Sequence, residues 1–257
     1  MELGLKDRTA VVLGATSGMG AAIAAGLGHE GANVVVVGRR GERAEQVAAG
    51  LPSAIGLQAD LSEPDTPARV VSAAHEAFGP IDVLVLNGGG PQPGTATDLT
   101  PDGADDAVAL LLRPHVAMVS AVLPQMAHRR WGRIIAVGSS GVQQPLPNLA
   151  ASNVGRAALA GYLKSLASEV AADGVTVNMV LPGRIDTDRV TQIDRGAAER
   201  RGITIDQARA ESEAGIPAGR YGTPEEFAAV ATFLASEPAA YVTGEQVRVD
   251  GGLVRHH

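Results

Sequence analysis

The stretch Thr9-Ala10-Val11-Val12-Leu13-Gly14-Ala15-Thr16-Ser17-Gly18-Met19-Gly20 joins a short apolar run to a loop with three glycines, and an Ala-rich segment follows it. The apolar run predicts a buried strand, and the following segment predicts a helix. Glycines between a strand and a helix permit a tight turn that approaches a phosphate, whose charge meets the amides of the helix N-terminus. We therefore expect a pyrophosphate site at Gly14, Thr16, Ser17, Gly18, Met19 and Gly20, with a plain turn as the alternative.

Short apolar runs alternate with longer amphipathic stretches along the whole chain. The runs predict seven strands, at residues 9–13, 33–37, 54–58, 83–86, 133–137, 175–180 and 246–249. The clearest helical periodicity covers residues 18–30, 67–77, 104–129, 150–171 and 224–235. Four consecutive valines at 34–37 are typical of a strand buried on both faces. The pattern predicts one α/β domain over residues 1–257, a Rossmann-type doubly wound parallel sheet of about seven strands with helices on both faces.

Residues 187–222 interrupt this alternation with a long segment rich in Arg, Glu and Asp. Long insertions in compact domains are usually functional, so we expect a mobile substrate lid of one or two helices. A solvated surface excursion is the alternative.

The composition excludes several classes of function. The chain has 257 residues, a formal net charge of −7 and 3% aromatic residues, so the positive surface and stacking side chains of a nucleic-acid binder are missing. It has no cysteine, which excludes disulfides and thiolate metal sites, and its histidines show no metal-binding spacing. We expect no metal, no membrane segment and no secretion signal, and hence a cytoplasmic protein. The terminal His256 and His257 would fit either a native end or the remnant of a tag.

The second predicted strand ends in Gly38-Arg39-Arg40. A site selective for NAD would place an acidic residue here, on the ribose 2′-hydroxyl, and Gly38 cannot fill that role. The planar guanidinium groups of Arg39 and Arg40 suit a phosphate, so the sequence favours NADP(H). The alternative is that both arginines only solvate the start of a helix.

Further motifs follow in a fixed order along the chain. They are Asp60-Leu61, Asn87-Gly88-Gly89-Gly90, Gly132-Arg133-Ile134-Ile135 with Ser139, Val177-Asn178, Pro182-Gly183 with Thr187, Tyr221-Gly222-Thr223-Pro224-Glu225-Glu226, Tyr241-Val242-Thr243-Gly244 and Val249-Asp250-Gly251-Gly252. With the glycine loop, these motifs make nearly the whole chain resemble the short-chain dehydrogenase/reductase family, especially a divergent branch of its β-ketoacyl-carrier-protein reductase-like members.

The resemblance implies roles for individual residues. Asp60 and Leu61 would meet the adenine, and Asn87 with Gly88 the ribose side of the cofactor. Val137 to Ser139 would line the nicotinamide, and Thr187 would meet its amide. Pro182, Gly183 and Ile185 are the remaining cofactor residues that the resemblance implies.

The sequence departs from the family at the catalytic positions. Typical members use Asn, Ser, Tyr and Lys; this chain keeps Ser139 but has Leu111, Ser152 and Arg156 in the other three places. Serine is a far weaker acid than tyrosine, so Ser152 is a poor proton donor. Arg156 would still hold the ribose hydroxyls of the cofactor.

Other residues are candidates for the proton or the substrate. His115 shares a helix face with Leu111 and carries protons readily, although packing alone would also explain it. We name Gln143, Arg184 and Tyr221 as substrate residues. Arg184 would meet an anionic group, unless Asp186 or Asp188 pairs with it.

The resemblance therefore implies an NADP(H)-dependent oxidoreductase that acts on a carbonyl or alcohol and forms a homotetramer. Its substrate would be a free small molecule or one linked to a carrier or CoA. A basic run at residues 128–133 would suit an acidic carrier, or simply the C-terminus of a helix. The alternative function is a non-redox enzyme (lyase, isomerase or cyclase) or a cofactor-binding scaffold, because function belongs to the site and not to the fold.

Overall fold

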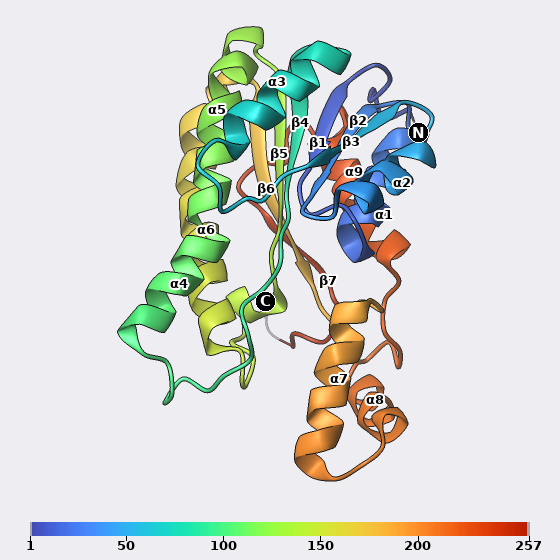
Figure 1. Cartoon of the computed structure of the whole chain (residues 1–257), viewed down its shortest axis with the longest axis vertical. Coiled ribbons are helices and arrows are strands. Elements are labelled where there is room, and N and C mark those ends of the chain that lie inside the picture. The colour runs from blue at the N-terminus through green and yellow to red at the C-terminus, as the bar shows by residue number, and fades with distance from the viewer. Residues whose placement is uncertain (1, 256–257) are drawn as a thin grey trace.

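A computed structural model describes residues 2–255 of the chain (Figure 1). The strands are β1 (Thr9–Val12), β2 (Asn33–Gly38), β3 (Ala54–Gln58), β4 (Ile81–Leu86), β5 (Gly132–Val137), β6 (Val175–Pro182) and β7 (Gln246–Val249). The α-helices are α1 (Gly18–His29), α2 (Gly41–Ala49), α3 (Thr66–Phe78), α4 (Pro101–Leu111), α5 (Arg113–Arg129), α6 (Ala150–Val170), α7 (Asp188–Arg201), α8 (Ile205–Ala214) and α9 (Pro224–Ala235). Short 3-10 turns, Ser140–Val142 and Ala171–Asp173, flank α6.

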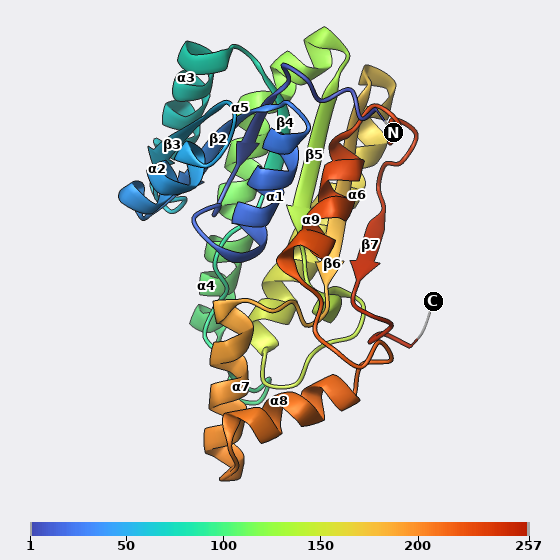
Figure 2. The same cartoon turned by 90° about the vertical axis from the view of Figure 1, so that its right-hand side faces the viewer.

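The seven strands form one parallel sheet in the order β3-β2-β1-β4-β5-β6-β7. Apolar residues of α3, α5 and α6 cover one face of the sheet, and those of α1, α2 and α9 cover the other (Figures 1 and 2). Both faces are therefore buried, which is why the central strands carry continuous Val, Ile and Leu runs. The predicted Rossmann-type fold is confirmed.

The predicted helix over residues 104–129 is two helices in the structure. The chain breaks at Leu112, whose φ and ψ are −116° and −57°, and α5 resumes with Pro114 in its first turn. Pro114 has no amide hydrogen to donate to the carbonyl four residues earlier, so a continuous helix would lack a bond at this point.

Residues Pro101–Arg129 are long and apolar enough, by length and composition alone, to cross a membrane. In the structure this segment is divided into α4 and α5, and α5 turns buried residues such as Met118, Val119 and Met126 toward the sheet. Its apolar character is thus used in packing against β4 and β5.

The segment predicted as a lid contains the two helices α7 and α8, which extend beyond the carboxyl ends of the strands (Figure 2). The Thr204 hydroxyl accepts a hydrogen bond from Gln207 N, and the Gln207 side chain accepts one from Thr204 N. The same capping box, between Thr223 and Glu226, begins α9.

At the opposite edge of the sheet, Trp131 immediately precedes β5 and lies between two arginines. The guanidinium carbons of Arg8 and Arg133 are 3.9 and 4.4 Å from the centre of its ring. Arg133 also donates to the carbonyls of Ser236 and Gly132, at 3.1 and 2.9 Å. These contacts lie at the amino end of the sheet, opposite the end at which the glycine loop follows β1.

Candidate functional site

The glycine loop is held against the end of β4. Asn87 follows β4, and its side-chain amide donates to the carbonyls of Leu13 and Gly14, at 3.2 and 3.0 Å. A Cβ on Gly20 would lie 2.5 Å from Gly14 O and 2.6 Å from Asn87 Nδ2, so only glycine fits there. Gly14 and Gly18 have positive φ angles of 59° and 55°, which glycine adopts without strain.

Other predicted cofactor residues lie around the same loop. A Cβ on Gly18 would be 3.3 Å from Thr187 Cγ2, and a Cβ on Gly88 would be 3.8 Å from Leu61 Cδ1. Segments that follow β1, β3, β4 and β6 therefore meet at the carboxyl edge of the sheet, where parallel α/β sheets bind ligands. Pro182, Gly183 and Ile185 belong to the same stretch as Thr187, while Met19 lies half-buried in the first turn of α1.

The end of β2 has no room for an acidic side chain at position 38. A Cβ on Gly38 would lie 2.4 Å from Thr16 Cγ2. Arg40 reaches back to the glycine loop and donates to Thr16 Oγ1 at 3.0 Å and to Ser17 Oγ at 3.1 Å. Arg39 is exposed beside this contact, so two guanidinium groups border the loop.

Asp60 carries a negative charge beside these arginines. Its carboxylate accepts from Ser62 N and Oγ, at 2.9 and 2.8 Å. These two bonds hold the pKa of Asp60 below its usual range, and the charge of Arg39 acts in the same direction. Asp60 is therefore a fixed hydrogen-bond acceptor at the end of β3.

The residues expected at the catalytic positions lie where β5 leads into α6. Ser139 accepts a hydrogen bond from Gly141 N at 3.1 Å, and Ser152 is half-buried in the first turn of α6. One turn later, the buried Arg156 donates Nη1 to Val137 O at 2.5 Å. Within residues 2–255 no carboxylate pairs with Arg156, and burial lowers its pKa to about 10. The site thus holds two hydroxyl groups and a buried cation, with no phenol.

Gln143 and Arg184, two of the three expected substrate residues, lie in different parts of the structure. Gln143 is half-buried and donates Nε2 to Gln246 Oε1 at 3.4 Å. Arg184 lines a cavity of about 170 Å³ together with Glu226 of α9 and with Asp250, which directly follows β7. Asp186, one of its two expected partners, instead forms a two-point ion pair with Arg209, at 2.8 and 3.2 Å.

The third substrate candidate, Tyr221, is buried. Its hydroxyl donates to Asp194 Oδ2 of α7 at 2.9 Å, and the Arg209 guanidinium carbon lies 4.7 Å from its ring centre. Burial raises the pKa of Tyr221, and hydrogen bonding to the Asp194 carboxylate acts in the same direction. In this arrangement the Tyr221 hydroxyl anchors α7 through Asp194, and its proton is used in that hydrogen bond.

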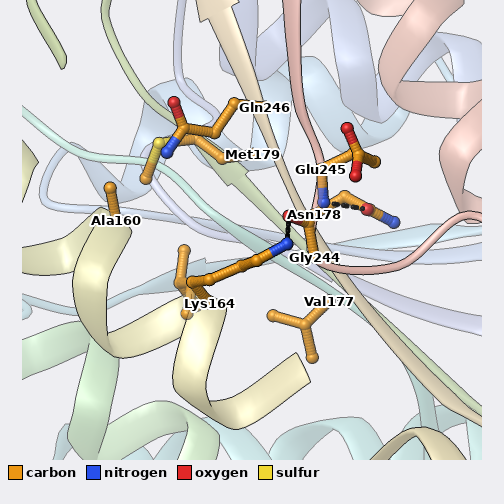
Figure 3. A pocket seen from close by; sticks show the side chains of 9 residues that line it. Ala160, Lys164, Val177, Asn178, Met179, Gly244, Glu245 and Gln246 are labelled. Carbon is orange, nitrogen blue, oxygen red and sulfur yellow. Dashed lines mark hydrogen bonds between the residues drawn. The ribbon is translucent and has the colours of Figure 1, made fainter. Parts of the chain in front are cut away.

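A second hollow lies on the other side of β6, between α6 and β7 (Figure 3). Lys164 Nζ donates to Gly244 O at 2.9 Å, and Asn178 Oδ1 accepts from Glu245 N at 3.1 Å. Its volume of about 10 Å³ holds at most one water molecule. It is therefore too small to hold a substrate.

Sequence reasoning missed two features of the site. Asn87 binds the glycine loop through its amide, and the loop spacing alone does not indicate that contact. Asp194 lies inside a charged helix and would be expected in solvent, yet it is buried against Tyr221. The only sequence signal for the second contact is the spacing of Val190 and Ala198, which places Asp194 between two apolar residues on one buried face of α7.

These features define an α/β protein whose glycine loop and strand ends form a candidate dinucleotide site at the carboxyl edge of a parallel sheet. A family model described as Enoyl-(Acyl carrier protein) reductase matches residues 14–254. The pig protein "Dehydrogenase/reductase SDR family member 4" is 35% identical over 254 residues, covering 96% of this chain and 88% of its own. The 3-oxoacyl-[acyl-carrier-protein] reductase of Vibrio cholerae is 34% identical, covering 98% and 99%.

Solved structures of reductases have the same fold as this chain. L-sorbose reductase of Gluconobacter frateurii, complexed with NADPH and L-sorbose, superposes with a TM-score of 0.93 at 31% identity over the full length of both chains. Actinorhodin polyketide ketoreductase with NADPH gives a TM-score of 0.91 at 32% identity, covering 97% of this chain and 98% of its own. The chain belongs to the short-chain dehydrogenase/reductase family, as the motifs predict, and its relatives are oxidoreductases.

Proposed function

We propose that the protein is an NADP(H)-dependent reductase of small carbonyl compounds with an atypical catalytic site. One observation supports the cofactor assignment: Thr16 leaves no room for a side chain at Gly38, and Arg39 and Arg40 lie next to it in the chain. A phosphate on the ribose fits this end of the site, whereas an acidic side chain that selects NAD does not. NADPH-bound neighbours of the same fold support the assignment.

The glycine loop suits a pyrophosphate because Gly14 and Gly18 have positive φ angles and Gly20 packs directly against Gly14, so the chain turns tightly into the N-terminus of α1. In the proposed enzyme Arg39 and Arg40 hold the 2′-phosphate, Asp60 and Leu61 face the adenine, and Thr187 with Ile185 faces the nicotinamide. Arg156 holds the hydroxyl groups of the nicotinamide ribose. NADPH, when bound, supplies the hydride that reduces a carbonyl carbon.

The substrate carbonyl would lie between Ser139 and Ser152, whose hydroxyls orient it by hydrogen bonds. Neither hydroxyl is an acid of useful strength near neutral pH, so the proton comes from water that enters beside the lid. Gln143 and Arg184 are substrate-side residues in this proposal, Arg184 for an anionic group of the kind that carrier- or CoA-linked substrates bear. Tyr221 joins them only if the lid moves and frees it from Asp194.

The assembly we propose is a cytoplasmic homotetramer in which residues 187–222 act as the lid of a single domain. Exposed apolar residues on the outer helices, Leu110 of α4 and Val154 of α6, support a contact between copies of the chain. The edge strand β7 has a neighbour on one side only, β6.

A second candidate function is a non-redox enzyme or a cofactor-binding scaffold. The observation that favours it is the pair Ser152 and Arg156, which provides a buried cation and no phenol. One experiment separates the two: NADPH oxidation is followed by absorbance with a panel of ketones and aldehydes, and the products are analysed. Reduced product formed at the rate of NADPH loss supports the reductase. NADPH binding without oxidation, or a product formed without NADPH loss, supports the second function.

A further inference from the structure

His115 is a buried histidine whose second ring nitrogen lacks a partner. It lies on the first turns of α5 with a side chain 1% exposed, and its Nδ1 is 2.8 Å from Leu111 O. A carbonyl oxygen only accepts, so Nδ1 carries the proton, and the neutral ring presents a lone pair at Nε2. Among residues 2–255, nothing donates to Nε2. A buried polar atom without a hydrogen-bond partner lowers the stability of the fold, so a partner such as an ordered water is expected beside it.

The polar groups that surround His115 come from neighbouring elements. Helices α4 and α6 are in direct contact, since a Cβ on Gly155 would lie 2.7 Å from Leu111 Cδ1, and Arg156 is the next residue of α6. The charge of Arg156 lowers the pKa of His115, whereas the backbone of Asn87, at the end of β4, acts on that pKa in the opposite direction. Val137, which accepts from Arg156, ends the adjacent strand β5.

Arg156 is incompletely satisfied in the same place. A guanidinium carries five N–H donors, and among residues 2–255 the Arg156 side chain makes one hydrogen bond, from Nη1 to Val137 O. Arg156, whose guanidinium has unused hydrogens, and His115, whose Nε2 has an unused lone pair, are both buried. They lie in one small region, beneath the ends of β4 and β5.

We propose that His115 is a positioning residue for Arg156, linked to the guanidinium through one bridging water. The water accepts a hydrogen bond from Arg156, donates one to His115 Nε2, and donates its other hydrogen to the carbonyl of Asn87. Three polar partners are what a buried water normally has. The link holds the guanidinium from the side of α5 while Val137 holds it from β5, so its remaining donors face the nicotinamide end of the site.

His115 must be neutral for this role, and its surroundings keep it so. Burial is the main cause that lowers its pKa to about 4, and the charge of Arg156 acts in the same direction. An imidazolium here would place two buried cations side by side and remove the lone pair.

The positioning role of His115 rests on the proposed function in one respect, the contact of Arg156 with the cofactor ribose. Two measurements therefore separate the link between His115 and Arg156 from the contact between Arg156 and the ribose. The first is made without cofactor: the imidazole ¹⁵N resonances of His115 are recorded at pH 7 in the wild type and in Arg156→Ala. We expect an unprotonated Nε2 whose resonance moves when the guanidinium is removed. A protonated Nε2, or an unchanged resonance, would overturn the proposal.

The second measurement is NADPH affinity by fluorescence titration. His115→Phe keeps the ring shape and removes the acceptor, and we expect affinity to fall about fivefold to tenfold, the equivalent of roughly one net hydrogen bond. His115→Gln retains an acceptor at similar reach and should restore most of the loss. Met118→Leu, on the same helix and equally buried, is the matched control and should bind like wild type.

A double-variant cycle completes the test. If His115 acts through Arg156, His115→Phe should have no further effect on affinity in the Arg156→Ala background. Equal losses in both backgrounds would overturn the positioning role. A normal NADPH affinity in Arg156→Ala, together with a shifted Nε2 resonance, would instead remove the ribose contact from the proposed function and leave the link between His115 and Arg156 in place.

Discussion

Gly155 on α6 lies so close to Leu111 on α4 that a Cβ on the glycine would be 2.7 Å from Leu111 Cδ1 and 2.8 Å from Ala107 O. The side chain of Leu111 is fully buried in this contact. Leu111, the position at which the resemblance implies an Asn, is therefore part of the packing between two helices. Adding a polar group at Leu111 alone would bury an amide here, at a cost in stability.

Gly155→Ala should destabilise the protein by about 1–3 kcal/mol, because the backbones of α4 and α6 would have to separate. Gly161→Ala on the same helix is the control, since its Cβ would meet no atom within 4 Å and alanine favours a helix by about 1 kcal/mol. Thermal unfolding measures both variants. Similar melting temperatures for the two would contradict the close contact.

NADPH should bind more tightly than NADH, and Arg39→Asp should reverse or abolish that preference. The loss of one charge-assisted contact to the 2′-phosphate costs about 1.5–3 kcal/mol, roughly a tenfold to hundredfold change in affinity. Calorimetric titration with each cofactor measures it, and Arg43→Ala, an exposed arginine of α2 bonded to Gln46, is the control. Equal affinities in the wild type would mean that Arg39 and Arg40 only solvate the turn.

Carbonyl reduction should be slow compared with typical relatives, by about 10²–10⁴, the usual contribution of a positioned general acid. Ser152→Ala should change turnover little, whereas Ser152→Tyr with Arg156→Lys should raise it if the remaining site supports hydride transfer. Steady-state rates with a common ketone panel measure both variants. Fast wild-type turnover that Ser152→Ala abolishes would show that this serine does supply the proton.

Stability should fall between about pH 6.5 and pH 4 because of His115. Its pKa is lowered from 6.5 to about 4 in the folded state, so the unfolded chain binds more protons across this interval. The stabilising contribution is complete above pH 6.5 and decreases as pH falls toward 4, by about 3 kcal/mol in total at about 1.4 kcal/mol per pKa unit. Urea unfolding at pH 7 and pH 5 measures it. If His115→Gln, which does not titrate, showed the same loss over this range, other groups would be responsible.

The protein should be a tetramer in solution. Light scattering at micromolar concentration should return four times the mass of one chain, and the exposed Val154 of α6 offers a variant, Val154→Glu, that should weaken the contact. A monomer in the wild type would remove the proposed assembly.

The fold could be predicted because short stretches of sequence indicate its elements. Buried strands have continuous apolar runs, and the pair Thr223 and Glu226 is typical of a helix start, here that of α9. The break between α4 and α5 was missed, although Pro114 could have indicated it, because apolar periodicity continues across Leu112. The polar partners in the site were not predictable. The contacts of Asn87 with Gly14, and of Tyr221 with Asp194, depend on how distant segments pack, and residue type alone leaves many partners possible.

The position of Trp131 between Arg8 and Arg133 has a spectroscopic consequence, since it is the only tryptophan in the chain. Its indole lies at the amino end of β5, whereas the glycine loop and Arg156 lie at the carboxyl end of the strands. Intrinsic tryptophan emission therefore reports whether this corner of the sheet is folded and stacked with its two cations. Cofactor binding is better followed by the emission of NADPH itself, so one sample reports folding and occupancy through two separate optical signals.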